Sequence, residues 1–164
     1  MLHSKEKGAL GEAEIICDLI SQGFPAFKEF GDNSKVDLIA LINNVPIKIQ
    51  VKSYHSGKNG AVGIGPKKSG PGYRFTYTRG QIDVFAVYVY DRDLILYVSA
   101  KKIIESGGLS IRLDATKNNQ QKGVHKASDY ISLKEALRDY TPVSLDWGED
   151  IVQTTTEEVL ASEN

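Results

Sequence analysis

Four polar side chains occupy positions where their neighbours in the sequence are apolar. Glu12 falls on the apolar side of a segment with helical periodicity, and Asp37 stands at the start of the apolar run DLIAL. Gln50 and Lys52 alternate with apolar residues in IKIQVK, so they share one face of a strand. Burying a carboxylate or an ammonium group is costly unless it is paired or bound to metal, so we predict that the four converge on one site.

The types of these residues indicate metal-dependent chemistry. Two carboxylates and an amide oxygen are ligands that suit a hard divalent cation such as Mg²⁺. A lysine beside them can orient an attacking water or stabilise negative charge that develops on a phosphate. We therefore predict that Glu12, Asp37, Gln50 and Lys52 are catalytic residues of a hydrolytic site with Mg²⁺ as the cofactor.

Each of the four residues also has a plainer interpretation. Glu12 can be an exposed helix acid, and Asp37 can form a structural salt bridge with Lys35 or Lys52. Gln50 can be an ordinary amide on a half-exposed strand. We favour the shared metal site because it gives the four unusual positions a single explanation.

A helix and a β-hairpin must position these side chains. We predict a helix over residues 4–22, begun by Ser4 as N-cap, followed by strands over 24–30, 36–42 and 45–53. Asn43-Asn44 favours a tight turn between the last two strands, because Asn tolerates positive φ. The apolar face of the helix is predicted to contain Ala9, Ala13, Ile16, Cys17 and Ile20.

The remaining pattern favours one α/β domain with a mixed sheet over residues 1–140, followed by an acidic tail over 141–164. Residues 54–72 contain six glycines and two prolines and are predicted to form a long loop. Strands are predicted over 73–78, 83–90, 94–99 and 109–113, of which 83–90 is the central buried one, and helices over 100–106 and 133–140.

The charges of the sequence are unevenly distributed. Residues 48–82 contain seven Lys and Arg residues and no acid, whereas residues 141–164 contain six acids and no Lys or Arg. A cationic segment attracts polyanions, so we predict contact with nucleic acid, although a solvated lysine-rich loop is the plainer alternative. The candidates for phosphate contact are Lys58, Lys67, Lys68, Arg74 and Arg79.

Residues 73–78 alternate aromatic and polar side chains. A β-ribbon fits the major groove of DNA, so Arg74 and Tyr77 are candidates for contact with base edges. Alternatively, Tyr73, Phe75 and Tyr77 form a core face, and the polar residues face water.

The composition excludes several classes of protein. The 164 residues contain no long apolar stretch that would span a membrane, and the charged N-terminus does not resemble a secretory signal. Cys17 is the only cysteine, which excludes an internal disulfide or a multi-cysteine zinc site. We expect a cytoplasmic protein in which Cys17 packs inside the fold.

The order of a helix Glu, a strand Asp and a hairpin that ends in an acid-x-Lys motif resembles the PD-(D/E)XK nuclease superfamily. Here it reads GALGEAEIICDLISQGF, then GDNSKVDLIALINN, then IKIQVKS. Together with DVFAVYVYDRDLILYVSA and LDATKNNQQKGVHKASDY, it is similar to the homing endonucleases encoded in bacterial group I introns, over residues 6–132.

The resemblance implies a restriction-endonuclease-like core, a mixed β-sheet flanked by helices, and assigns roles to residues. Glu12 and Asp37 match the metal-binding acids, Lys52 matches the catalytic lysine, and the backbone carbonyl of Val51 is implied as a metal ligand. Gln50 departs from the usual acid, and its neutral amide oxygen would bind the metal more weakly. Lys35 and Ser53, which adjoin the motif, join the candidates for DNA contact.

The resemblance further implies a Mg²⁺-dependent, site-specific endonuclease for double-stranded DNA. Because one site cuts one strand, a homodimer or a homotetramer is expected. The alternatives are a structure-selective nuclease such as a Holliday-junction resolvase, a DNA-binding module of this fold weakened by Gln50, and an unrelated α/β binding protein.

Overall fold

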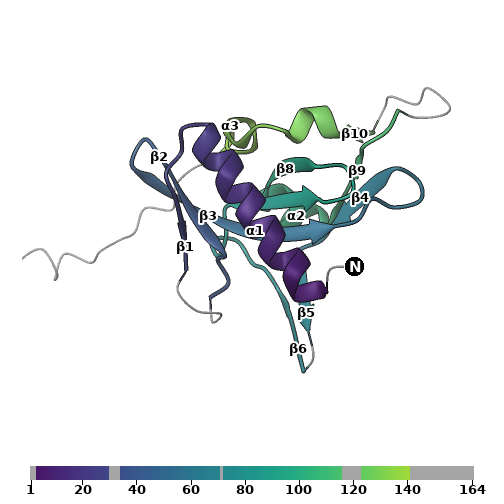
Figure 1. Ribbon diagram of the computed structural model, residues 1–164, viewed down its shortest axis with the longest axis horizontal. Helices are drawn as coiled ribbons and strands as arrows, with labels where there is room; N and C mark the ends of the chain where they lie inside the picture. Colours follow the sequence, from purple (N-terminus) through teal and green to yellow (C-terminus); the bar gives the residue numbers. More distant parts are fainter. Residues whose placement is uncertain (1–2, 30–33, 71, 116–122, 141–164) are drawn as a thin grey trace, which may run out of the picture.

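The computed structural model describes residues 3–29, 34–70, 72–115 and 123–140. A long first helix crosses a sheet, and shorter elements cover the other face of that sheet (Figure 1). In chain order the elements are α1 Ser4–Ser21, β1 Ala26–Lys28, β2 Leu38–Ile42, β3 Val45–Tyr54, β4 Ala61–Ile64, β5 Lys67–Gly70, β6 Tyr73–Thr76, β7 Val84–Val89, β8 Leu94–Ser99, α2 Ala100–Ser106, β9 Leu109–Arg112, β10 His125–Lys126, a 3₁₀ helix over Ala127–Tyr130, and α3 Leu133–Ala136.

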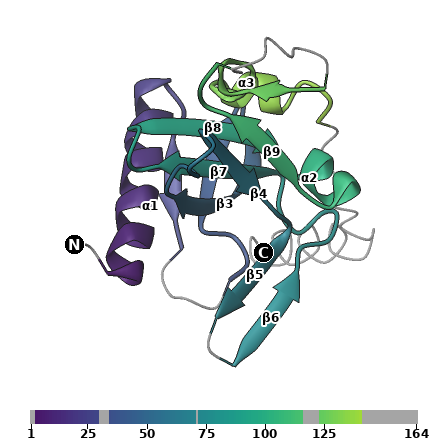
Figure 2. The same ribbon diagram turned by 90° about the vertical axis from the view of Figure 1, so that its right-hand side faces the viewer.

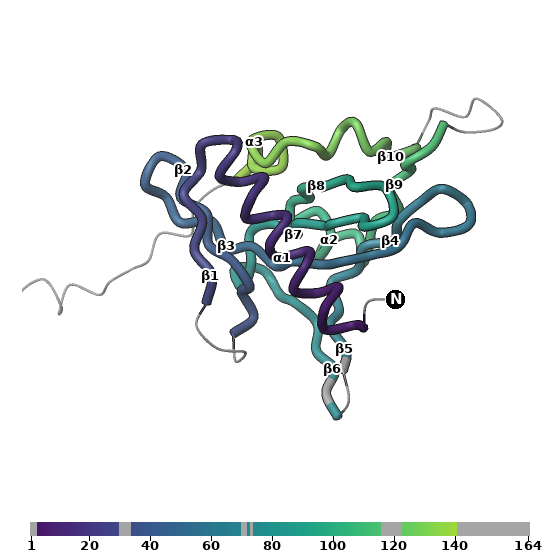
Figure 3. The backbone as a smooth tube through the Cα atoms, viewed as in Figure 1, coloured from purple at the N-terminus to yellow at the C-terminus, as the bar shows by residue number. Residues whose placement is uncertain are grey.

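The central sheet has the strand order β1-β2-β3-β7-β8. β3 pairs parallel to β7, and the other neighbouring strands pair antiparallel, so the predicted mixed sheet is confirmed. The predicted hairpin is present too, with Leu38 opposite Ile49 in its register. Asn43 and Asn44 connect its strands with φ angles of 51° and 64°, as the tight-turn prediction required. Figure 3 traces this path from α1 through the hairpin.

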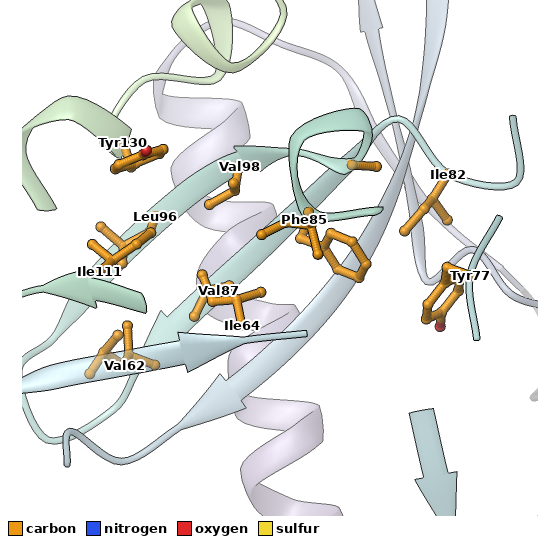
Figure 4. Close-up of a cluster of buried hydrophobic side chains, with 13 residues drawn as sticks. Val62, Ile64, Tyr77, Ile82, Phe85, Val87, Leu96, Val98, Ile111 and Tyr130 are labelled. Carbon is orange, nitrogen blue, oxygen red and sulfur yellow. The ribbon is translucent and has the colours of Figure 1, made fainter. Parts of the chain in front are cut away.

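Side-chain alternation along the sheet separates two cores. Ile47, Ile49 and Val51 of β3 pack with α1, whereas Phe85 and Val87 of β7 pack on the opposite face of the sheet. All six residues of β7 are buried, which confirms the prediction of a central buried strand. Figure 4 shows the second core, in which side chains of β4, β7, β8 and β9 meet.

The α1 helix differs from its predicted form at its start and in its buried face. Its N-cap is His3, not Ser4, and the His3 backbone N–H donates to the Glu6 carboxylate at 2.6 Å. The buried residues are Gly11, Ile15 and Leu19, so the predicted face was wrong. Of that face Ile16 is partly buried, and the residues exposed to solvent are Ala9, Ala13, Cys17 and Ile20.

The glycine-rich segment is not the predicted long loop. It contains β4, which pairs with β9, and β5, which pairs with β6 to form a two-stranded ribbon over Lys67–Gly70 and Tyr73–Thr76. The ribbon projects from the body of the molecule (Figures 1 and 2). The last helix ends at Ala136, four residues before its predicted end.

The predicted acidic tail, residues 141–164, lies outside the described residues, and the domain boundary at residue 140 stays a prediction. Among the helices that the structure describes, none combines the length and the apolar character needed to cross a membrane.

Candidate active site

The β2–β3 hairpin brings Asp37 and Gln50 into contact. Asp37 directly precedes β2, and its backbone N–H donates to the Ile49 carbonyl at 3.0 Å. Its Oδ2 accepts hydrogen bonds from the Val51 backbone N–H at 2.8 Å and from Gln50 Nε2. Antiparallel pairing therefore fixes the carboxylate against the middle of β3, thirteen residues away along the chain.

Gln50 lies inside the protein with all its polar groups satisfied. Its side chain is 2% exposed, and it is the one buried polar or charged residue in the described part of the chain. Nε2 donates to Asp37 and, at 3.0 Å, to the Val51 carbonyl, while Oε1 accepts from the Tyr77 hydroxyl. The two amide protons therefore hold together a carboxylate oxygen and a carbonyl oxygen.

Lys52 lies two residues further along the same face of β3. Its ammonium group donates to the Lys67 carbonyl at 3.0 Å and lies 5.4 Å from the centre of the Phe85 ring. Burial lowers the pKa of Lys52, the charge of Lys68 lowers it further, and Asp37 opposes both effects. Burial raises the pKa of Asp37, against the Val51 N–H and the charge of Lys68.

Glu12 lies at the margin of this cluster. Its carboxylate forms an ion pair with Lys28 of β1 at 2.7 Å. It is still close enough for its negative charge to raise the pKa of Asp37. The structure thus brings Asp37, Gln50 and Lys52 together, as predicted, and places Glu12 beside them with a partner that the sequence did not indicate.

The donor atoms at this position suit a hard divalent cation. The Asp37 carboxylate and the Val51 carbonyl face the same point, and Glu12 lies nearby. No group of three or more His, Cys, Asp or Glu side chains in the described ranges could hold a metal, so a site here needs amide or carbonyl oxygens. For Gln50 to act as a ligand, its amide must turn, and the Tyr77 hydroxyl can then accept from Nε2 instead of donating to Oε1.

Four of the predicted DNA-contacting residues lie on or against the β5–β6 ribbon. Lys67 and Arg74 are exposed on its two strands. Lys68 is half-buried, with its ammonium group 3.9 Å from Asp37 Oδ1. Lys35 lies over the ring of Phe75, 5.4 Å from its centre. The ribbon therefore concentrates positive charge beside the cluster of Asp37, Gln50 and Lys52.

Four other candidates are placed differently. Tyr77 is 1% exposed and packs edge-on against Phe85, so the predicted base contact is wrong and the alternative of a core face is right for this residue (Figure 4). Ser53 Oγ is buried on the α1 side of the sheet, away from the predicted surface. Arg79 is paired with Glu105, and Lys58 lies in the β3–β4 turn, which projects in another direction from the ribbon (Figure 1).

Two hollows help to locate the site. Asp37 lines a surface hollow between β1 and β2, so the carboxylate borders a concave surface. A hollow of about 570 Å³ lies elsewhere, near α2 and α3, around Lys102 and Tyr130. Its lining mixes acids and bases and contains none of the residues predicted for the catalytic site.

Sequence reasoning missed two contacts within the site. These are the hydrogen bond from Tyr77 to Gln50 and the approach of Lys68 to Asp37. The alternation of Phe75 and Tyr77 with polar residues was a signal for the first, because it places these two rings on one face of the chain. Nothing in the sequence indicates the second, which depends on the direction in which the ribbon leaves the sheet.

Comparisons with known proteins show what the sequence and the fold are similar to. A family model described as PD-(D/E)XK endonuclease matches residues 2–133. No curated protein matches the sequence closely enough to count as a relative. The solved structure of a bacterial homing endonuclease, I-Ssp6803I, is similar with a TM-score of 0.62 and 20% identity, and the match covers 99% of this chain and 100% of that one. This likeness confirms the predicted restriction-endonuclease-like α/β fold.

Proposed function

Since the chain belongs to the PD-(D/E)XK endonuclease family, we propose that this nuclease cuts double-stranded DNA at a specific site and depends on Mg²⁺. Nucleases of this family generally use divalent metal ions. The observation that carries the proposal is the meeting of Asp37, Gln50 and Lys52 beside a basic ribbon. A homing-type activity is supported by the likeness to the structure of the bacterial homing endonuclease I-Ssp6803I.

The residues around Asp37 would hold the cation. We assign Asp37, Glu12, the Val51 carbonyl and Gln50 as its ligands, which requires Glu12 to leave Lys28 and the Gln50 amide to turn. Bound Mg²⁺ supplies Lewis-acid activation of water and of the phosphate.

Lys52 acts on the phosphate itself. The Lys67 carbonyl holds its ammonium group at 3.0 Å, so the charge is positioned before the substrate arrives. A fixed positive charge stabilises the negative charge that develops on the phosphate oxygens during hydrolysis. Lys52 thus contributes electrostatic stabilisation that needs little reorganisation of the site.

Cutting both strands requires more than one copy of the site. One subunit carries one cluster of Asp37, Gln50 and Lys52, so we propose that the enzyme acts as a homodimer or a homotetramer on duplex DNA. Lys35, Lys67, Lys68 and Arg74 would meet the phosphate backbone, since they lie on or against the ribbon.

Cleavage of mixed plasmid DNA with Mg²⁺, and with a chelator in its place, tests the proposal. We expect defined ends with Mg²⁺ only. Asp37→Asn and Lys52→Met should each reduce cleavage by at least about a hundredfold while the protein still binds DNA, because they remove charges that act on the transition state.

Asp83→Asn is the matched control. Asp83 is half-buried like Asp37, has a pKa raised by burial, and accepts a 2.8 Å hydrogen bond from the β3 backbone at Lys48. This variant should cut like the wild type. Wild-type cleavage by Asp37→Asn would refute the assignment, cleavage of four-way junctions alone would indicate a resolvase, and binding without cleavage would indicate a DNA-binding module.

A further inference from the structure

The β5–β6 ribbon and Tyr77, the residue directly after β6, together contact the three residues that meet in the site. The Lys67 carbonyl accepts from Lys52 Nζ at 3.0 Å, and Lys68 Nζ lies 3.9 Å from Asp37 Oδ1. The Tyr77 hydroxyl donates to Gln50 Oε1. The Tyr77 backbone N–H donates to the Pro66 carbonyl at 2.8 Å, where the ribbon joins the body of the molecule. A projecting element that contacts two members of a site directly, and the third through the residue that follows it, is placed to influence how the site is occupied.

Lys68 is the ribbon side chain that reaches the metal-binding carboxylate. Its side chain is 36% exposed, that of Asp37 is 16% exposed, and the neighbouring Lys67 is exposed to solvent. Among the charged neighbours, Lys68 also has the largest effect on the pKa of Asp37 and on the pKa of Lys52. An ammonium group therefore stands beside Asp37 while the protein is free of DNA.

We propose that Lys68 is a further active-site residue, whose ammonium group neutralises Asp37 in the free protein and moves to a DNA phosphate, so that metal binding and DNA binding favour each other. This inference rests on the proposed function, because it assumes that Asp37 binds the cation.

The coupling follows from competition for one carboxylate. A divalent cation and an ammonium group repel each other, so Lys68 weakens metal binding as long as it stays beside Asp37. A phosphate backbone that meets the exposed Lys67 and Arg74 offers Lys68 another anion within the length of its flexible side chain. Reciprocity of linked equilibria then requires the metal to strengthen DNA binding by the same factor.

The test compares Lys68→Met with Lys67→Met, which removes the same charge from the adjacent, outward-facing position. Mn²⁺ binding to the DNA-free protein at pH 8, measured by electron paramagnetic resonance, is the readout. We expect Lys68→Met to tighten Mn²⁺ binding about tenfold, as the loss of a nearby like charge predicts, and Lys67→Met to change it less than about twofold.

A second arm measures the coupling itself. In a Lys52→Met background, which prevents cleavage, a DNA duplex should tighten Mn²⁺ binding, and the gain should shrink when Lys68→Met is added but not when Lys67→Met is added. Equal Mn²⁺ affinity for wild type and Lys68→Met, with a lower melting temperature for the variant, would show a structural ion pair and overturn the inference. If Asp37→Asn also left Mn²⁺ affinity unchanged, the proposed function would fail with it.

Discussion

At the scale of single residues, the site carries an electrostatic cost in the absence of metal. Asp37 is half-buried, and although it accepts hydrogen bonds from Val51 and Gln50, burial still raises its pKa. A carboxyl group whose pKa is higher in the folded state stabilises the fold most when it is protonated, and this contribution is lost as the pH rises through the folded pKa. The charged form of Asp37 thus lowers the stability of the fold, and a cation bound to this carboxylate would offset that cost.

Asp37→Asn should therefore increase the free energy of unfolding at pH 7.5, by about 1 kcal/mol, because the cost of burying this negative charge exceeds what its hydrogen bonds and the nearby Lys68 ammonium group offset. The difference from wild type should grow as the pH rises and should fall toward zero below the usual pKa range of an aspartate, where Asp37 is protonated in both states. Urea unfolding at pH 3.5–7.5 measures it.

Asp91→Asn is a control for which the opposite change in stability is expected, because the pKa of Asp91 is lowered in the folded state. Hydrogen bonds from Ser56 lower the pKa of Asp91, so its stabilising contribution is present at neutral pH and is lost as the pH falls through the folded pKa. This variant should be less stable than wild type at neutral pH. A stability difference for Asp37→Asn that did not depend on pH would contradict the assigned cost of its charge.

At the scale of elements, the position of α1 depends on one close approach to β3. A Cβ atom added at Gly11 would lie 2.0 Å from Ser53 Oγ and 3.5 Å from the Cβ of Tyr88. Only a residue without a side chain lets the helix pack at this depth. Because Glu12 is the next residue, this contact also determines how near its carboxylate comes to Asp37.

Gly11→Ala should cost about 1–3 kcal/mol of stability, because overpacking outweighs the better helix propensity of alanine. Adding Ser53→Ala should recover most of the loss, since it removes the closest atom. Gly8→Ala, in the same helix with open space around it, should instead stabilise by about 0.5–1 kcal/mol. Thermal unfolding of five proteins measures these effects: wild type, Gly11→Ala, Ser53→Ala, their double variant and Gly8→Ala. Equal effects at positions 8 and 11 would show that the close approach is unimportant.

The accuracy of sequence-based prediction also depends on the element. The hairpin was predictable because Asn43-Asn44 and the alternation along β3 are local signals. The buried β7 strand was predictable because its sequence is a nearly continuous apolar run. β4 and β5 were missed because the glycines of residues 54–72 hide strands whose pairing with β9 and β6 depends on the fold. The buried face of α1 was misjudged because small residues such as Gly11 give no hydrophobic signal. Lys68 was predicted to contact DNA alone, because no local sequence signal indicates its approach to Asp37.

At the scale of the whole molecule, positive charge is concentrated on a projecting ribbon, while the sequence as a whole has a formal charge of −1. Such a distribution favours contact with a polyanion at one part of the surface. Since each phosphate contact releases counterions, the salt dependence of DNA affinity reports how many of these charges take part.

Arg74→Ala should weaken DNA binding and reduce the slope of log affinity against log salt by about 1, as expected for the loss of one phosphate contact. Arg92→Ala serves as the control, because Arg92 already forms two hydrogen bonds with Asp114, at 3.0 and 3.1 Å. Fluorescence anisotropy over a range of salt concentrations provides the measurement. An unchanged slope for Arg74→Ala would remove this residue from the DNA-contacting surface.

The amide of Gln50 has a consequence for how the molecule matures. Its two protons already bridge the oxygens of Asp37 and Val51. An acid at this position would crowd carboxylate and carbonyl oxygens together in the interior, and an ion or a bound proton would have to offset their repulsion. With glutamine there, no ion is needed to offset such repulsion while the polypeptide folds, so under the proposed function folding and loading with a cation would be separate events.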